Sequence, residues 1–311
     1  MKNILKSIIF VTIFILILVI LTFILLPSKD ILEFGVYNVS KYEILGEKRD
    51  TIDVVAIGDS LVYSSLSPME IWNEFGYTAF DSAEPAQIIE NAYKSVDIAI
   101  KSQHPKIILL EANVILRDPK NQNKYTRLYR ENKDYNPLGL HHNNWKNYIT
   151  YGDKSEWINV YKGFKFITKI EPSKNKVYMK PSKELRVIPN NNLKVFNKIV
   201  SLCQKNDVKL VLISFPTQTS WGYKKHNTIA KIASENNLEF IDLNLVDLGI
   251  DWQIDTKDNG SHLNYRGALK ATKYIGEYLS KLEMLEDKRK NPEYESWNKA
   301  YEKYIKTEAM A

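Results

Sequence analysis

The sequence predicts an α/β protein in which a doubly wound, parallel five-stranded sheet follows one N-terminal transmembrane helix. The first observation is an apolar stretch without charged side chains at residues 7–26. The second is that short apolar runs then alternate with segments of helical periodicity, which is typical of a parallel sheet with helices on both faces. The third is a basic, aromatic-rich insertion at residues 117–183 that interrupts this alternation.

The overall composition is that of a folded globular protein. The 311 residues include 44% hydrophobic and 26% charged side chains, with a net charge of +6. These values exclude a disordered chain, a collagen and a bundle of many membrane helices. The single cysteine, Cys203, cannot form an internal disulfide. The folded domain must therefore depend on its hydrophobic core, and not on disulfides, for stability.

The N-terminal apolar stretch is long enough to cross a bilayer, because twenty helical residues span about 30 Å. Lys2 and Lys6 precede it, which favours a cytoplasmic N-terminus and places the rest of the chain outside the cytoplasm. A cleaved signal peptide is the alternative. We favour an uncleaved anchor, because the stretch exceeds the usual apolar region of a signal peptide and no small-residue cleavage site follows. The expected location is the cell membrane, with a single pass.

The predicted strands are short apolar runs at residues 52–57, 77–80, 106–111, 208–215 and 238–242. The predicted helices between and after them cover residues 67–76, 85–102, 192–205, 223–236 and 265–282. The first of these helices has clear end signals, since Ser67 suits the N-cap, Pro68 the first turn and Gly76 the C-terminal end. Together these elements predict five parallel strands with intervening helices.

The predicted organisation has four parts. Residues 1–27 form the cytoplasmic N-terminus and anchor, 28–51 a juxtamembrane segment, 52–285 the sheet domain, and 286–311 a charged, peripheral C-terminal helix. The insertion at 117–183 has fifteen Lys or Arg against six Asp or Glu, together with eleven aromatic residues. Such a surface suits anionic polymers, sugars or lipid head groups. The alternative is a helical subdomain with its aromatics packed inward. Nucleic acid is not expected as a partner outside the membrane.

Two sequence blocks carry the chemistry. Gly58-Asp59-Ser60-Leu61 follows the first strand directly, at the carboxyl end where open parallel sheets bind ligands. Near the other end of the chain, Asp258-Asn259-Gly260-Ser261-His262-Leu263-Asn264 precedes the last helix. Together the two blocks resemble the opening and closing blocks of the SGNH/GDSL hydrolase superfamily. The resemblance covers residues 54–279 and leaves the insertion outside.

The resemblance implies the roles of the site residues. Ser60 would be the nucleophile, His262 the general base and Asp258 the carboxylate that orients the imidazole. The backbone N–H groups of Ser60 and Ala83 and the side chain of Asn113 would bind the oxyanion. Ala83 stands where we align the family's glycine, and Glu111-Ala112-Asn113 resembles its Gly-x-Asn block. No metal or cofactor is implied, and no substrate-binding residue is indicated.

The third member of the triad stays open. The family places its Asp three residues before the His, where this chain has Asn259. Asp258 takes the role if one residue is inserted. Asp255 and a Ser60-His262 dyad without a carboxylate are the alternatives.

A narrower resemblance is to membrane-anchored proteins that work beside a multi-spanning O-acyltransferase, namely alginate-acetylation proteins and DltD-like teichoic-acid D-alanylation proteins. The anchor, the Glu111-x-Asn113 block and the ending at residues 262–268 carry it. It implies O-acyl transfer, with acetyl favoured, to or from an extracellular polysaccharide through an acyl-Ser60 intermediate. The partners would be an acyl-ester or polysaccharide substrate and that membrane acyltransferase. The alternatives are an anchored esterase or deacetylase, and a non-catalytic polysaccharide-binding scaffold.

Overall fold

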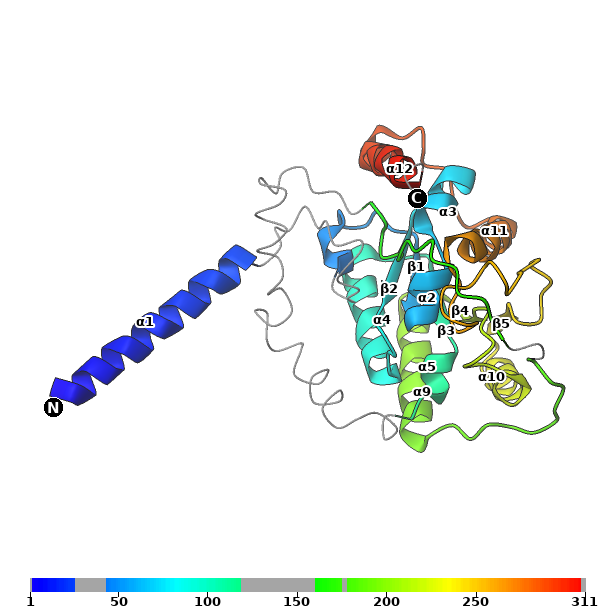
Figure 1. Ribbon diagram of the computed structural model, residues 1–311, viewed down its shortest axis with the longest axis horizontal. Coiled ribbons are helices and arrows are strands. Elements are labelled where there is room, and N and C mark those ends of the chain that lie inside the picture. Colours follow the sequence, from blue (N-terminus) through cyan, green and yellow to red (C-terminus); the bar gives the residue numbers. More distant parts are fainter. Residues whose placement is uncertain (1, 26–42, 119–159, 175–177, 309–311) are drawn as a thin grey trace. The chain divides into compact units, whose positions relative to one another are not determined.

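The computed structural model describes residues 2–25, 43–118, 160–174 and 178–308 (Figure 1). The chain divides into two compact units, one made of residues 1–32 and 119–157 and the other of residues 33–118 and 158–311. The described part of the first unit is the helix α1 (Lys2–Leu25). The second unit contains the sheet and all the candidate site residues. Most of the predicted juxtamembrane segment and most of the predicted insertion lie outside the described residues.

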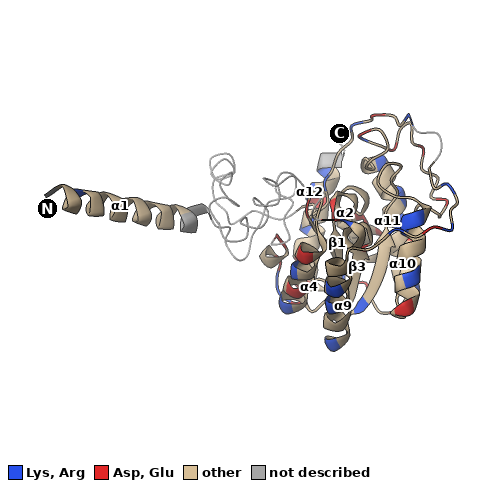
Figure 2. Ribbon diagram, turned by 90° about the horizontal axis from the view of Figure 1, so that it is seen from below, with Lys and Arg blue, Asp and Glu red and all other residues tan. Residues whose placement is uncertain are grey.

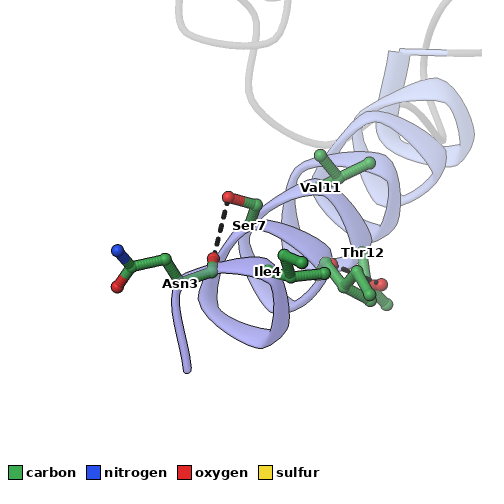
Figure 3. Close-up of a pocket in the computed structure, with 6 residues that line it drawn as sticks. Asn3, Ile4, Ser7, Val11 and Thr12 are labelled. Carbon is green, nitrogen blue, oxygen red and sulfur yellow. Dashed lines mark hydrogen bonds between the residues drawn. The ribbon is translucent and has the colours of Figure 1, made fainter. Parts of the chain in front are cut away.

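The helix α1 is apolar along its length. Residues 3–21 are long and apolar enough to cross a membrane, and Figure 2 shows α1 uncharged over most of its extent. Two of its polar side chains bond within the helix (Figure 3): Ser7 Oγ donates to the Asn3 carbonyl at 3.1 Å and Thr12 Oγ1 to the Ile8 carbonyl at 2.9 Å. Such internal bonding suits a lipid environment, where no water can replace it. A membrane anchor and a signal sequence both fit this helix.

The second unit is built on a parallel five-stranded sheet with the order β2-β1-β3-β4-β5, which confirms the predicted fold class. The strands are β1 (Val54–Gly58), β2 (Ala79–Ala83), β3 (Ile107–Glu111), β4 (Lys209–Ser214) and β5 (Glu239–Asp242). Every residue of β1, β2 and β3 is buried. The chain leaves β1 in one direction for β2 and returns on the other side for β3. This reversal is the switch point at which such sheets bind ligands.

Helices cover both faces of the sheet (Figure 1). They are α2 (Ser60–Ser65), α3 (Pro68–Phe75), α4 (Ile89–Gln103), α5 (Asn113–Leu116), α9 (Asn190–Lys205), α10 (Tyr223–Glu235), α11 (Tyr265–Lys281) and α12 (Glu295–Glu308), with 3₁₀ turns η1 (Glu43–Gly46) and η4 (Pro292–Tyr294). One buried cluster joins the sheet to α4, α9 and α10. The other joins its opposite face to α2 and α11.

Several helix boundaries follow the predicted signals, and others do not. α3 has Ser67 as N-cap, Pro68 in its first turn and Gly76 in the left-handed conformation at φ 71°. α4 starts at Ile89, later than predicted, because a turn with Ala86 at φ 48° precedes it. α12 is not merely peripheral: Trp297 and Tyr304 are buried, and the Trp297 ring lies 5.4 Å from that of Trp72 in α3.

Residues 160–174 belong to the predicted insertion and form an extended segment, which we call the strap. These fifteen residues contain no helix, while most of the segment for which a helical subdomain was considered lies outside the described residues. Its backbone pairs with β2 through Asp81 N–H to the Lys162 carbonyl (2.9 Å) and with α2 through Lys165 N–H to the Tyr63 carbonyl (2.7 Å). Further on, Glu171 N–H donates to the Thr256 carbonyl at 3.0 Å. The strap therefore runs from the edge of the sheet to the loop that carries His262.

Candidate active site

Three side chains from opposite ends of the chain meet at the carboxyl end of the sheet. Ser60 is the first residue of α2, directly after β1, and His262 lies just before α11. His262 Nε2 is 2.7 Å from Ser60 Oγ, and His262 Nδ1 is 2.5 Å from Asp258 Oδ2. The other oxygen of Asp258 accepts the His262 backbone N–H at 2.7 Å. A proton on Nδ1 satisfies this arrangement and leaves Nε2 as the acceptor facing the serine.

The loop before α11 explains why Asp258 reaches His262 across four residues. Asn259 and Gly260 both have left-handed backbones, at φ 56° and 85°. These angles turn the chain back on itself, and Thr256 closes the turn by donating from Oγ1 to the His262 carbonyl at 2.9 Å. The Asp258 carboxylate is thereby held beside the imidazole.

Asp255, the other carboxylate considered for this role, and Asn259, which lies three residues before His262, have different partners. Asp255 is fully buried, and its carboxylate binds Lys270 Nζ at 2.6 Å and the Asp251 N–H at 2.8 Å. It ties the loop to α11. Asn259 holds the strap, because its N–H donates to the Glu171 carbonyl at 3.0 Å and its side-chain oxygen accepts the Lys174 N–H at 2.9 Å.

The environment shifts the acid–base properties of the site. Partial burial raises the pKa of Asp258, but the hydrogen bonds and charge of His262 outweigh it, so that the pKa lies below its ordinary value. Burial raises the pKa of Tyr63 to about 12, against the opposing effect of its hydrogen bond with Ser60. Burial also lowers the pKa of Lys257 to about 8. Its ammonium donates to Ser64 Oγ at 2.8 Å.

The turn from β1 into α2 is fixed by Gly58 and Asp59. A Cβ on Gly58 would lie 2.4 Å from the Cβ of Glu111 in β3, so the close approach of the two strand ends requires glycine. Asp59 is the N-cap of α2, and its Oδ1 accepts the Leu61 N–H at 2.9 Å. Its Oδ2 accepts from Arg117 and, at 3.4 Å, from the Asn113 amide. The cap leaves Ser60 at the first helical position, where its N–H has no partner within the helix.

Asn113 begins α5 at the end of β3, next to this turn. Its backbone N–H donates to Glu111 Oε1 at 3.0 Å. Glu111 is fully buried. Burial is the main reason why its pKa lies well above the ordinary value, and the nearby Asp59 charge is the second. Glu111 thus supports the backbone of Asn113.

The structure argues against Ala83 as an oxyanion donor. Ala83 is the last residue of β2 and pairs with Gly58, and the neighbouring Glu84 N–H donates to the Gly58 carbonyl. Alternate N–H groups along a strand point to opposite edges. The Asp81 N–H points away from β1, to the Lys162 carbonyl, and the Ala83 N–H shares that direction. The backbone angle that favours glycine falls at Ala86 instead.

The described histidines outside the site form separate pairs. His104 Nδ1 is 2.6 Å from Asp50, and His226 Nδ1 is 2.8 Å from the buried Asp242. No group of three His, Cys, Asp or Glu side chains suited to a metal ion occurs within the described residues.

The comparisons with known proteins give similarities of fold. No family model and no curated protein matches the chain. Among solved structures, a putative acylhydrolase from Bacteroides fragilis is 13% identical with a TM-score of 0.40, covering 76% of this chain and 88% of its own. A putative lipolytic protein of the G-D-S-L family from Desulfitobacterium hafniense is 12% identical with a TM-score of 0.41, covering 72% and 97%. A family 3 carbohydrate esterase from Clostridium thermocellum is 11% identical with a TM-score of 0.41, covering 74% and 96%. At such distances the function rests on this chain's own side chains.

Proposed function

We propose that the protein is a serine-dependent enzyme of the SGNH type that cleaves or transfers an acyl ester at Ser60. The observation that carries this proposal is the continuous hydrogen-bonded line from Ser60 through His262 to Asp258. A serine hydroxyl is a poor nucleophile by itself, and this line supplies both the base and the group that stabilises its charged form.

The chemistry runs in two matched halves. Ser60 Oγ bonds to the ester carbonyl carbon while its proton moves to His262 Nε2, and the carbonyl electron pair moves onto the oxygen. The Ser60 N–H and the Asn113 amide stabilise that oxyanion, each donor being worth on the order of 3 kcal/mol. When the intermediate collapses, the bond to the leaving alcohol breaks and the alcohol takes the proton from Nε2. The resulting acyl-Ser60 ester is attacked by water or by an acceptor hydroxyl in the same way.

We further propose that the acceptor or donor is an extracellular or cell-envelope polysaccharide, with acetyl as the favoured acyl group and a multi-spanning membrane acyltransferase as the partner. The helix α1 supports a membrane location. Basic groups around the reaction centre support an anionic polymer: Lys257 and Lys165 lie close enough to repel each other, and Lys169 interacts with the Asp258 charge. Long-range attraction of this kind raises the local concentration of an anionic substrate.

The deciding experiment is product analysis with a small acetyl ester in the presence and absence of polysaccharide acceptors. Acetylated polymer that requires Ser60 supports the transferase. Free acetate alone, unchanged by any acceptor, favours the anchored esterase or deacetylase that shares the same residues. If Ser60 neither turns over an ester nor reacts with a fluorophosphonate probe, the protein is a non-catalytic scaffold and the proposal fails.

A further inference from the structure

The amide of Asn113 is held by a lysine from a distant part of the chain. Lys225, in α10, donates from Nζ to Asn113 Oδ1 at 2.7 Å and to the Ser220 carbonyl at 2.5 Å. The two residues are 112 positions apart in sequence. The Lys225 side chain is partly buried, and burial lowers the pKa of Lys225. A buried charge is costly, so its placement against a proposed oxyanion donor calls for a functional reason.

The contact fixes which end of the amide faces the reaction centre. An ammonium group has only donors, so the atom it contacts must be the amide oxygen. The NH₂ end of Asn113 is thereby directed to the opposite side, toward Asp59 at 3.4 Å. That distance is long for a hydrogen bond, and the second N–H of the amide has capacity for another acceptor.

The lysine also supplies a positive charge to this end of the site. The Asp59 carboxylate is paired with Arg117, and burial keeps the pKa of Glu111 well above its ordinary value. The Lys225 charge acts on the amide directly, and it also interacts with the Glu111 and Asp59 carboxylates and is repelled by Arg117. A hydrogen bond to the oxygen of an amide polarises the group and strengthens donation from its nitrogen. Because the Ala83 N–H is directed to the other edge of β2, the oxyanion would depend on the Ser60 N–H and the Asn113 amide. A stronger donor at Asn113 would therefore stabilise the oxyanion further.

We propose that Lys225 is a positioning residue that orients and polarises the Asn113 amide for binding the oxyanion formed at Ser60. The inference rests on the proposed function, since it concerns the transition state of that reaction. Lys225 acts through Asn113 and does not itself touch the substrate. Its loss should therefore lower kcat while KM for a small neutral ester stays unchanged.

The test compares Lys225→Met with Lys225→Gln, using hydrolysis of p-nitrophenyl acetate and the rate of Ser60 labelling by a fluorophosphonate. The methionine removes both hydrogen bond and charge, whereas the glutamine keeps a donor for the Asn113 oxygen. We expect kcat to fall about tenfold to thirtyfold for Lys225→Met and less for Lys225→Gln. The matched control is Lys224→Met, the neighbouring residue of α10, which is exposed and pairs with Glu184; its kcat should be unchanged.

A double-mutant cycle shows whether the effect passes through Asn113. Asn113→Ala should cost on the order of 100-fold, and Lys225→Met should then cost nothing further in that background, because the two residues act as one unit. Additive losses would overturn the inference, as would a folded Lys225→Met or Lys225→Gln variant with full kcat. If Lys225→Met fails to fold, Lys225→Gln in both backgrounds completes the same cycle. A wild-type protein that neither turns over nor labels removes the proposed function and this inference together, whereas an active wild type with indifferent Lys225 variants removes only the inference.

Discussion

Replacing Asp258 by Asn gives a prediction whose size follows from the geometry. The carboxylate lies 2.5 Å from His262 Nδ1 and stabilises the imidazolium that forms when Ser60 gives up its proton. Two unit charges about 4 Å apart attract by about 4 kcal/mol at an effective dielectric constant of 20. The Asp258 side chain is 37% exposed, so water screens part of this attraction and about 2 to 3 kcal/mol is expected to remain. Asp258→Asn should therefore lower kcat about 30-fold to 150-fold.

The measurement is steady-state hydrolysis of p-nitrophenyl acetate, with thermal unfolding of each variant followed in parallel. Asp255→Asn is the matched control, because Asp255 is fully buried and bound to Lys270. It should lower stability by about 1 to 3 kcal/mol through the unpaired lysine, while the kcat of the folded enzyme stays within about twofold, a change of about 0.4 kcal/mol or less. Asp258→Asn should instead lower kcat and leave the stability of the protein nearly unchanged. Equal kcat in the two variants and the wild type would refute the reasoning and leave a Ser60-His262 dyad.

Three further changes have defined outcomes. Ser60→Ala should abolish turnover and probe labelling without lowering the unfolding temperature, because this half-buried side chain contributes chemistry rather than packing; residual activity at the wild-type level would exclude Ser60 as the nucleophile. Gly58→Ala should destabilise the protein by about 1 to 3 kcal/mol in urea unfolding, since the added Cβ meets Glu111; an unchanged midpoint would contradict that contact. For Lys257, whose pKa lies at about 8, KM for a negatively charged ester should rise as the pH passes through 8 and the ammonium loses its proton. KM for a neutral ester should not change over this pH range. In Lys257→Met, KM for the negatively charged ester should also no longer depend on pH around 8.

Much of the fold could be predicted because buried parallel strands are short, continuous apolar runs in the sequence. Residues Val54 to Gly58 are apolar throughout, as expected of a strand covered on both faces, and their short length favours a strand over a helix. The short helices α2 and α5 escaped prediction, since six and four residues are too few to show a helical period. The strap escaped for a different reason: its lysines suggested a solvated surface, whereas Lys162 is buried against Glu47 at 2.7 Å.

Some residues of the candidate site could be predicted from the sequence, and others could not. Ser60, Asp258 and His262 were found because each lies in a local block with its own spacing, and the structure brings the three together. Lys225, Tyr63 and Lys257 carry no such signal, since their partners are remote in sequence or depend on burial. The direction of the Ala83 N–H follows from the pairing of Ala83 with Gly58 in the sheet, and the short sequence block around Ala83 does not show that pairing.

Whether acyl-Ser60 passes its group to water or to a hydroxyl depends on what occupies the space beside His262. The side chains of His262 and Asp258 are 24% and 37% exposed, so water reaches the base in the absence of a substrate. In a transferase with this geometry, the acceptor hydroxyl must compete with this water for acyl-Ser60. Transfer should then rise with acceptor concentration at the expense of free acetate, while the rate of acylation stays constant, because acylation precedes acceptor attack. The strap borders the same loop through Glu171 and Thr256.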